Sequence, residues 1–119
     1  MTITYVITGT RPNLTIQATD PHAIVVTVSY NTNTPMKSAY NSIRDAFITA
    51  YTTMTYTCVW SGTGNSRICQ ATDSYANTIT QLMDVTYYNE LCRCMTIGAF
   101  VNLYGMSDDN KLYQQLEMY

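Results

Sequence analysis

Three short stretches near the start of the chain alternate apolar and polar residues with a period of two. They span residues 2–8, 14–18 and 23–30, and the third is rich in β-branched side chains. This period is typical of a half-buried β-strand. Turn-forming residues separate the stretches, with Pro12 in the first gap and Pro21 in the second. The pattern predicts a three-stranded antiparallel meander over residues 2–31.

The period then changes to three and four. Thr34 stands before Pro35, which is the arrangement of an N-cap residue followed by proline in the first helical turn. The apolar positions that follow are Tyr40, Ile43, Phe47, Tyr51 and Met54. This spacing predicts an amphipathic helix that ends near Met54.

Residues 56–60 and 67–71 flank a loop of turn-forming residues, 61–66, and predict a second hairpin. Symmetric closure of this loop places Cys58 opposite Cys69 and Trp60 opposite Arg67. After the hairpin, we expect Asp73 or Ser74 to cap a second helix, whose inner side carries Ala76, Ile79 and Met83.

Residues 92–104 alternate strictly, which favours a strand, although Leu91, Met95 and Ala99 also fit a helical stripe. Ser107, followed by two aspartates, is expected to open a short final helix that carries Leu112, Tyr113 and Leu116. No repeat or linker is evident, so residues 1–119 are expected to form a single domain. The predicted fold class is α+β: one two-layer domain, with a mostly antiparallel sheet (the N-terminal meander plus the hairpin) packed against two or three helices.

Composition narrows the range of functions. Charged residues make up only 12% of the chain and the net charge is −2, whereas Thr, Tyr, Asn, Ser and Gln together supply 52 of the 119 residues. The absence of a basic cluster disfavours nucleic-acid binding. No apolar run of 18 residues and no basic n-region occurs, so neither a membrane partner nor a signal peptide is expected. The cytoplasm is the expected compartment, of the host cell if the chain is viral.

Four cysteines offer weak candidates for chemistry. Cys58 and Cys69, facing each other in the hairpin, could form a cross-strand disulfide, half of a metal site, or simply a pair of small buried side chains. Cys92 and Cys94 are separated by one residue, and the spacing of the four does not match a zinc template. We therefore predict Cys58 and Cys69 as a disulfide candidate and expect neither a metal nor a cofactor.

Catalysis lacks the usual residues. His22, the only histidine, falls in a predicted turn and is expected to be an exposed loop residue. The glycine-containing loop at 61–66 lacks the lysine and the following helix of a phosphate loop. Several carboxylates fall at predicted caps, where backbone hydrogen bonding already accounts for them. A non-enzymatic protein is therefore expected.

The 11 tyrosines are the most unusual feature. Uncharged surfaces rich in Tyr, Thr and Asn resemble adaptable protein-binding surfaces, although tyrosines also cover the edges of small cores. The predicted contact residues are Trp60, Tyr87, Tyr88, Tyr104 and Tyr113. The leading hypothesis is a small non-enzymatic protein-binding module, of the kind that a virus or phage uses as an accessory protein to inhibit a host factor. The alternatives are a self-assembling structural subunit of a virion, with the chain itself as partner in a homo-oligomer, and a cysteine-dependent thiol or metal-binding protein.

Overall fold

The fold is described from a computed structural model, which covers residues 2–84 and 90–119. Within these described residues, two antiparallel three-stranded sheets and three α-helices give the α+β class that the sequence predicts. The chain divides into two compact units: unit 1 comprises residues 1–50 with 101–119, and unit 2 comprises residues 51–100. The prediction that residues 1–119 form one domain stays a prediction.

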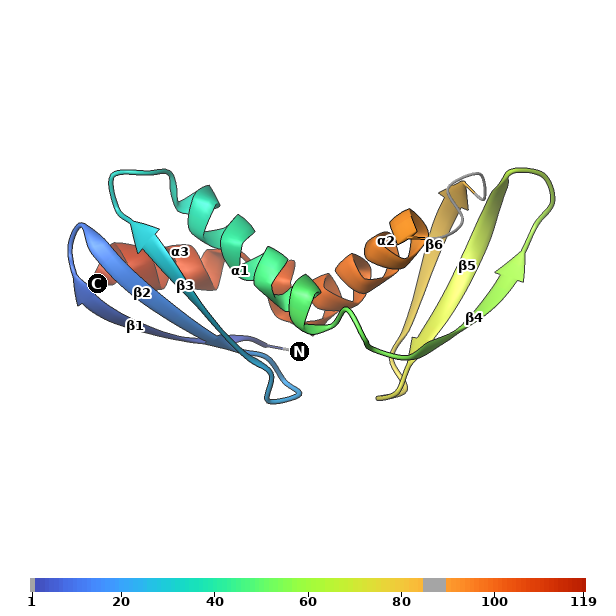
Figure 1. The fold of residues 1–119 in the computed structure, drawn as a ribbon, viewed down its shortest axis with the longest axis horizontal. Helices are drawn as coiled ribbons and strands as arrows, with labels where there is room; N and C mark the ends of the chain where they lie inside the picture. The colour runs from blue at the N-terminus through green and yellow to red at the C-terminus, as the bar shows by residue number, and fades with distance from the viewer. Residues whose placement is uncertain (1, 85–89) are drawn as a thin grey trace. The chain divides into compact units, whose positions relative to one another are not determined.

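Unit 1 contains the predicted meander. Its strands are β1 (Thr4–Thr10), β2 (Asn13–Thr19) and β3 (Val25–Asn31), in the order β1-β2-β3, and we call them sheet A. The helix α1 (Met36–Ala50) follows β3 and packs against it, and α3 (Asn110–Met118) contacts β1 (Figure 1). The three strands and α1 therefore confirm the alternating and helical patterns of the first 50 residues.

Sheet A buries one face and exposes the other, as alternation requires. The inward residues are almost fully buried, including Leu14, Ile16, Ala18, Val26 and Tyr30. Ala39, Ile43 and Phe47 of α1 and Leu112 and Leu116 of α3 complete the core. At about 25 cal/mol per Å² of apolar surface, this burial is the main stabilising term of the unit.

Unit 2 contains the strands β4 (Tyr56–Ser61), β5 (Ser66–Asp73) and β6 (Thr78–Asp84), which form sheet B in the order β4-β5-β6. The helix α2 (Glu90–Val101) follows, and its Phe100 ring lies 6.1 Å from the Tyr56 ring. A cation–π contact also places the Arg93 guanidinium 5.3 Å from the Tyr56 ring. The predicted hairpin of residues 56–71 is confirmed as β4 and β5.

The two sheets belong to an internal repeat, which corrects the expectation that the chain has none. Each sheet is an antiparallel meander followed by a helix, and adding 53 to a residue number in the first repeat gives its counterpart in the second. β3 begins at Val25 and β6 at Thr78, in keeping with this offset. When residues 1–53 are paired with residues 54–106 at this offset, 15 of the 53 pairs are identical. The segment Ala-Thr-Asp occurs at 18–20 and again at 71–73.

The turn after the central strand has the same structure in both repeats. Asp20 Oδ1 accepts hydrogen bonds from the backbone N–H groups of His22 and Ile24, both at 2.9 Å. Its counterpart Asp73 accepts from Tyr75 and Asn77, at 2.9 and 2.8 Å. The buried carboxylate thus closes the turn by satisfying two backbone donors, as Asx turns do.

Two further backbone features recur at the same offset. Ala23 and Ala76 adopt left-handed conformations with φ of 66° and 65°, and Gly9 and Gly62 have φ of 101° and 94°. A left-handed alanine is strained by its Cβ, so its occurrence at equivalent positions marks a turn that both repeats require. The repeat is therefore a repeat of detailed backbone geometry as well as of topology.

Two secondary-structure predictions for the second half are wrong. The helix expected after Asp73 is the strand β6, because the left-handed Ala76 reverses the chain there and Ile79 and Met83 also fit a period of two. The strand expected over 92–104 is α2, followed by a π-helical turn, η2 (Asn102–Met106). Side chains four apart, at Cys92, Thr96 and Phe100, are buried, as on one face of a helix.

The hairpin register also differs from prediction. Trp60 pairs with Cys69, and Cys58 pairs with Ala71, so the partners are shifted by two residues from those that symmetric loop closure gives. The predicted final helix is confirmed as α3, which begins at Asn110 after Ser107–Asp109. Among the helices in the described ranges, none is both long and apolar enough to cross a membrane.

Candidate functional site

The outward face of sheet A carries a compact group of uncharged side chains at the end nearest the Asp20 turn. Two rows cross the three strands there: Thr4 pairs with Thr19 and Thr19 with Val25, while Val6 pairs with Gln17 and Gln17 with Thr27. Five of the six are exposed and Thr19 is half-buried. We call these six residues patch A: Thr4, Val6, Gln17, Thr19, Val25 and Thr27.

Sheet B carries the equivalent group. Thr57 pairs with Thr72 and Thr72 with Thr78, while Val59 pairs with Gln70 and Gln70 with Thr80. Again five of the six are exposed, and Thr72, the counterpart of Thr19, is half-buried. We call these residues patch B: Thr57, Val59, Gln70, Thr72, Thr78 and Thr80.

Five of the six positions are identical between the two patches. Only Val25, which corresponds to Thr78, differs. In patch B this difference allows a hydroxyl–hydroxyl hydrogen bond of 3.0 Å between Thr72 and Thr78.

The inward positions of the same strands show the opposite pattern, although two of them in sheet B, Cys58 and Arg67, are exposed. Eight inward pairs other than glycine relate the two sheets, and only Ala18 and Ala71 are identical. Tyr5 corresponds to Cys58, Ile16 to Cys69, and their packing has changed accordingly. Within the patches the repeats thus have nearly the same outward residues, whereas most inward residues differ.

Folding alone does not account for this pattern. Substitutions at exposed positions usually change stability by less than about 0.5 kcal/mol, whereas core substitutions cost several times more. Thr and Val are favourable in strands, which explains part of the identity. Glutamine has no such preference, yet Gln17 and Gln70 stand at the centre of the two patches. Burial and strand preference therefore leave the identity of these two glutamines unexplained.

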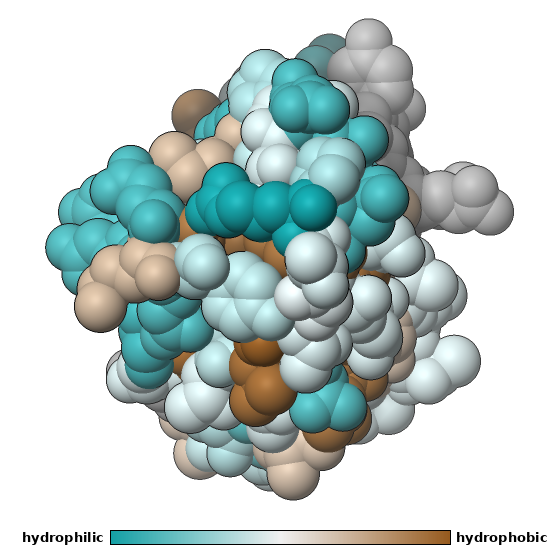
Figure 2. All heavy atoms as spheres, turned by 90° about the vertical axis from the view of Figure 1, so that its left-hand side faces the viewer, coloured by the Kyte–Doolittle hydropathy of each residue, from teal (hydrophilic) through white to brown (hydrophobic). Residues whose placement is uncertain are grey.

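Neither patch carries an ionisable side chain. The carboxylates that follow Thr19 and Thr72 in the sequence, Asp20 and Asp73, are buried and bound to backbone N–H groups. Figure 2 looks onto the side of unit 1 that carries the β1–β2 turn and the C-terminus. Much of the visible surface is pale, which is the colour of side chains that are neither strongly hydrophilic nor strongly hydrophobic. Exposed apolar side chains are nevertheless present in both patches, because Val6 is 56% and Val59 63% exposed.

The predicted contact residues do not form this site. Tyr104 is wrong as a contact residue, because it is fully buried and its ring meets His22 edge-on at 4.4 Å. Tyr113 is half-buried, and so is Trp60, which lies on the inward side of β4. Tyr87 and Tyr88 lie outside the described residues. His22, expected to be an exposed loop residue, is half-buried by this contact.

The cysteine pair lies close together despite the shifted register. Cys58 and Cys69 are diagonal neighbours, and the Cys69 thiol donates a hydrogen bond to Cys58 Sγ across 3.5 Å. All four cysteines are free. Burial, together with the hydrogen bond and the neighbouring Cys58 thiol, raises the pKa of Cys69 to about 12, so this thiol stays protonated at neutral pH. The disulfide stays a prediction.

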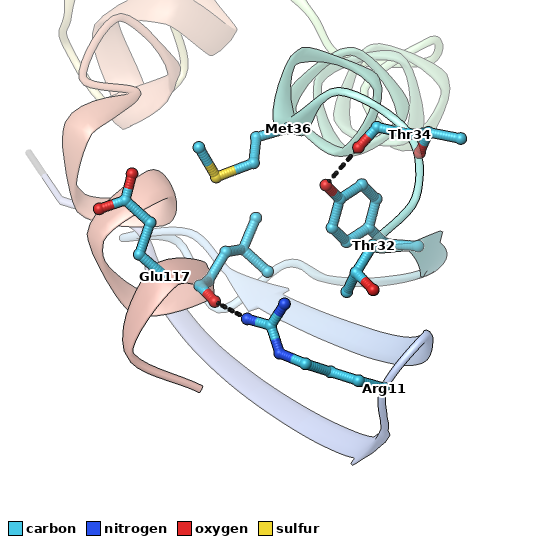
Figure 3. A pocket seen from close by; sticks show the side chains of 7 residues that line it. Arg11, Thr32, Thr34, Met36 and Glu117 are labelled. Atoms are coloured by element: carbon cyan, nitrogen blue, oxygen red, sulfur yellow. Dashed lines mark hydrogen bonds between the residues drawn. The ribbon is translucent and has the colours of Figure 1, made fainter.

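Other candidate sites are weaker. Figure 3 shows a hollow of about 360 Å³ in unit 1, lined by residues that include Arg11, Tyr30 and Glu117. Arg11 donates to the Leu116 carbonyl at 2.6 Å and Tyr30 to the Thr34 carbonyl at 2.7 Å, so both polar groups hold the walls together. Over residues 2–84 and 90–119, no three His, Cys, Asp or Glu side chains are grouped as a metal site would require.

Comparisons with protein-family models, curated proteins and solved structures found no match. The internal repeat therefore supplies the comparison from which the site is inferred. The sequence does contain its signal, because Ala-Thr-Asp recurs with Gln before it at Gln17 and Gln70. The periodicity of apolar residues does not reveal this signal, because the identical residues lie mostly on the outward face and in the turn.

Proposed function

We propose that the protein is a non-enzymatic binding module that contacts other proteins through patch A and patch B. The observation that carries the proposal is the identity of five outward positions in two sheets whose inward faces have diverged. Two copies of one exposed surface, kept in one chain, are best explained by a common kind of contact at both.

The chemistry of the patches suits a protein surface. Threonine hydroxyls and glutamine amides both donate and accept hydrogen bonds, and the exposed valines add apolar area. Such a surface loses water at a lower cost than one rich in lysine and glutamate, and charged residues are depleted at the centres of protein interfaces. A phosphate backbone, in contrast, needs lysine or arginine, and neither patch has one.

The proposal keeps the predicted class of function but changes the residues. Gln17 and Gln70 take the central role that the sequence assigned to tyrosines and Trp60. The cytoplasmic location, the viral or phage origin and the inhibitory role rest on composition alone, and we propose them on that basis.

Differential capture tests the proposal. The full chain and its Gln17→Lys, Gln70→Lys double variant are used as bait in extract of the cells that naturally make the protein, and captured proteins are quantified by mass spectrometry. Gln114→Lys is the matched control, because Gln114 is exposed on α3 and belongs to neither patch. We expect specific proteins to be captured by the parent chain and the control and lost from the double variant. An identical set of proteins on all three baits would contradict the proposal.

A further inference from the structure

We infer that each patch binds the equivalent patch of another copy of this chain, so that one molecule can join two others. The inference rests on the proposed function, since it names one partner of the same two surfaces. Three features of the molecule bear on it: the patch residues are self-complementary, the sheet faces have a limited size, and each chain has two patches.

Each residue type in the patches is complementary to itself. The amide of Gln17 can exchange hydrogen bonds with the amide of Gln17 or Gln70 in another copy, because it carries both a donor and an acceptor. Threonine hydroxyls pair in the same way, as Thr72 and Thr78 already do within sheet B at 3.0 Å. Val6 and Val59 supply exposed methyl groups that gain by contact with one another.

Electrostatics permits this contact between copies. A face with several charges of one sign repels its own copy, whereas these patches have no ionisable side chain. The net charge of the whole chain is only −2, so long-range repulsion between molecules is weak. Identical molecules can therefore approach with these faces together.

The size of a sheet face sets the strength of the contact. Three strands spaced about 4.8 Å apart and seven residues long, at about 3.3 Å per residue, give a face of roughly 330 Å². A stable protein interface buries about 800 Å² per partner. A single face therefore supports a weak, reversible contact, and association is expected to depend strongly on concentration.

The number of patches sets the form of the assembly. A molecule with one self-complementary surface stops at a dimer, whereas a molecule with two can extend into a chain or close into a ring. Patch A and patch B are present in every copy. Blocking one patch should therefore limit association to dimers, and blocking both should leave monomers.

Sedimentation velocity of the full chain tests this directly, over concentrations from about 10 μM to about 1 mM, the range of weak contacts. We expect the parent chain and the Gln114→Lys control to pass beyond two molecules as concentration rises. Gln17→Lys alone and Gln70→Lys alone should stop at dimers, and the double variant should stay monomeric, with association at the altered patch weakened at least about tenfold. Circular dichroism checks that every variant is folded.

A charge-reversed pair gives an independent arm. Thr27→Glu and Thr80→Glu place acidic groups beside the central glutamine of each patch. This double variant should also be monomeric alone, but should associate when mixed with the Gln17→Lys, Gln70→Lys double variant, because opposite charges then meet. A defect in folding would not be reversed by mixing.

Three results would overturn the inference: a monomeric parent chain at about 1 mM, the range of weak contacts; single variants that still pass beyond dimers; or a mixture of the two charged variants that stays monomeric. A monomeric parent chain would leave the proposed function intact if differential capture still depended on the patches. Patch-dependent self-association without any captured protein would leave the inference intact and contradict binding to other proteins.

Discussion

Replacing Asp20 or Asp73 by alanine should destabilise the protein by about 2–4 kcal/mol. Each buried carboxylate accepts two backbone hydrogen bonds of 2.8–2.9 Å. Hydrogen bonds to charged groups contribute about 1.5–3 kcal/mol each, and water recovers part of the loss because the turns lie at the surface. Asp73 also accepts from the Asn77 side chain at 3.1 Å, so its replacement should cost at least as much. Such a loss is a large part of the roughly 5–15 kcal/mol that stabilises a domain.

Urea unfolding followed by circular dichroism measures the effect. Asp20→Asn should lose only about half as much as Asp20→Ala, because the amide oxygen remains an acceptor but carries no charge. Asp45→Ala is the control, since Asp45 is exposed on α1 and its loss should cost less than about 0.5 kcal/mol. If Asp20→Ala and Asp45→Ala have the same midpoint, the carboxylate does not hold the turn together and the reasoning is refuted.

Three further predictions concern the two sheets. Oxidation by a small-molecule disulfide should join Cys58 to Cys69, because their sulfur atoms lie 3.5 Å apart. Mass spectrometry of a digest should find the two cysteine-containing peptides linked. If the Cys58 peptide is still disulfide-linked within the chain in Cys69→Ser, the prediction is contradicted. Because burial raises the Cys69 pKa from 9.0 to about 12, the unfolded thiol ionises first as pH rises, and the free energy of unfolding should fall between pH 9.0 and about 12. In Cys69→Ala, the free energy of unfolding measured in urea should fall less steeply as the pH rises. A fall as steep as in the parent chain would contradict the raised pKa of Cys69. Val25→Thr should add a hydroxyl pair with Thr19 like the one in sheet B and raise the free energy of unfolding by about 0.2–1 kcal/mol in urea, whereas a loss would contradict the equivalence of the two sheets.

The first half of the chain could be predicted because its local patterns agree with its packing. The alternation in β1, β2 and β3 matches the side of sheet A that is buried, and the apolar residues of α1 recur at helical spacing. Where one periodicity fits and turn residues bound it, sequence alone is sufficient. The details of capping were not predictable, since the Thr34 hydroxyl donates to the Asn31 carbonyl.

The secondary structure of the second half was harder to predict, because two periodicities fit the same residues. Ile79 and Met83 are four apart, which suits a helix, but they are also an even number apart, which suits a strand. Met95 and Leu103 alternate as in a strand, yet both are exposed, while Phe100 between them is fully buried. Tertiary packing decides between the two, and a single sequence does not contain that information directly.

The candidate site was predictable only in part. Low charge and abundant threonine correctly indicated uncharged outward faces, and this is what both patches have. Tyr104 was assigned to the surface because the five tyrosines in the C-terminal third could not all be buried, but it is fully buried. Strand pairing was needed to bring Val6, Gln17 and Thr27 into one row, since they lie on three strands.

The discontinuity of unit 1 has a consequence for synthesis on the ribosome. Residues 51–100 form unit 2 as one continuous segment, whereas unit 1 joins residues 1–50 to residues 101–119. Arg11 is bound to the Leu116 carbonyl and the Gly9 carbonyl to the Tyr119 hydroxyl, so the first strands meet residues that are made after unit 2. Unit 2 can therefore complete its contacts while the inward face of sheet A still awaits α3. During that interval the side of β1 that α3 contacts is not yet covered, and the speed of translation through residues 51–119 sets how long it stays so.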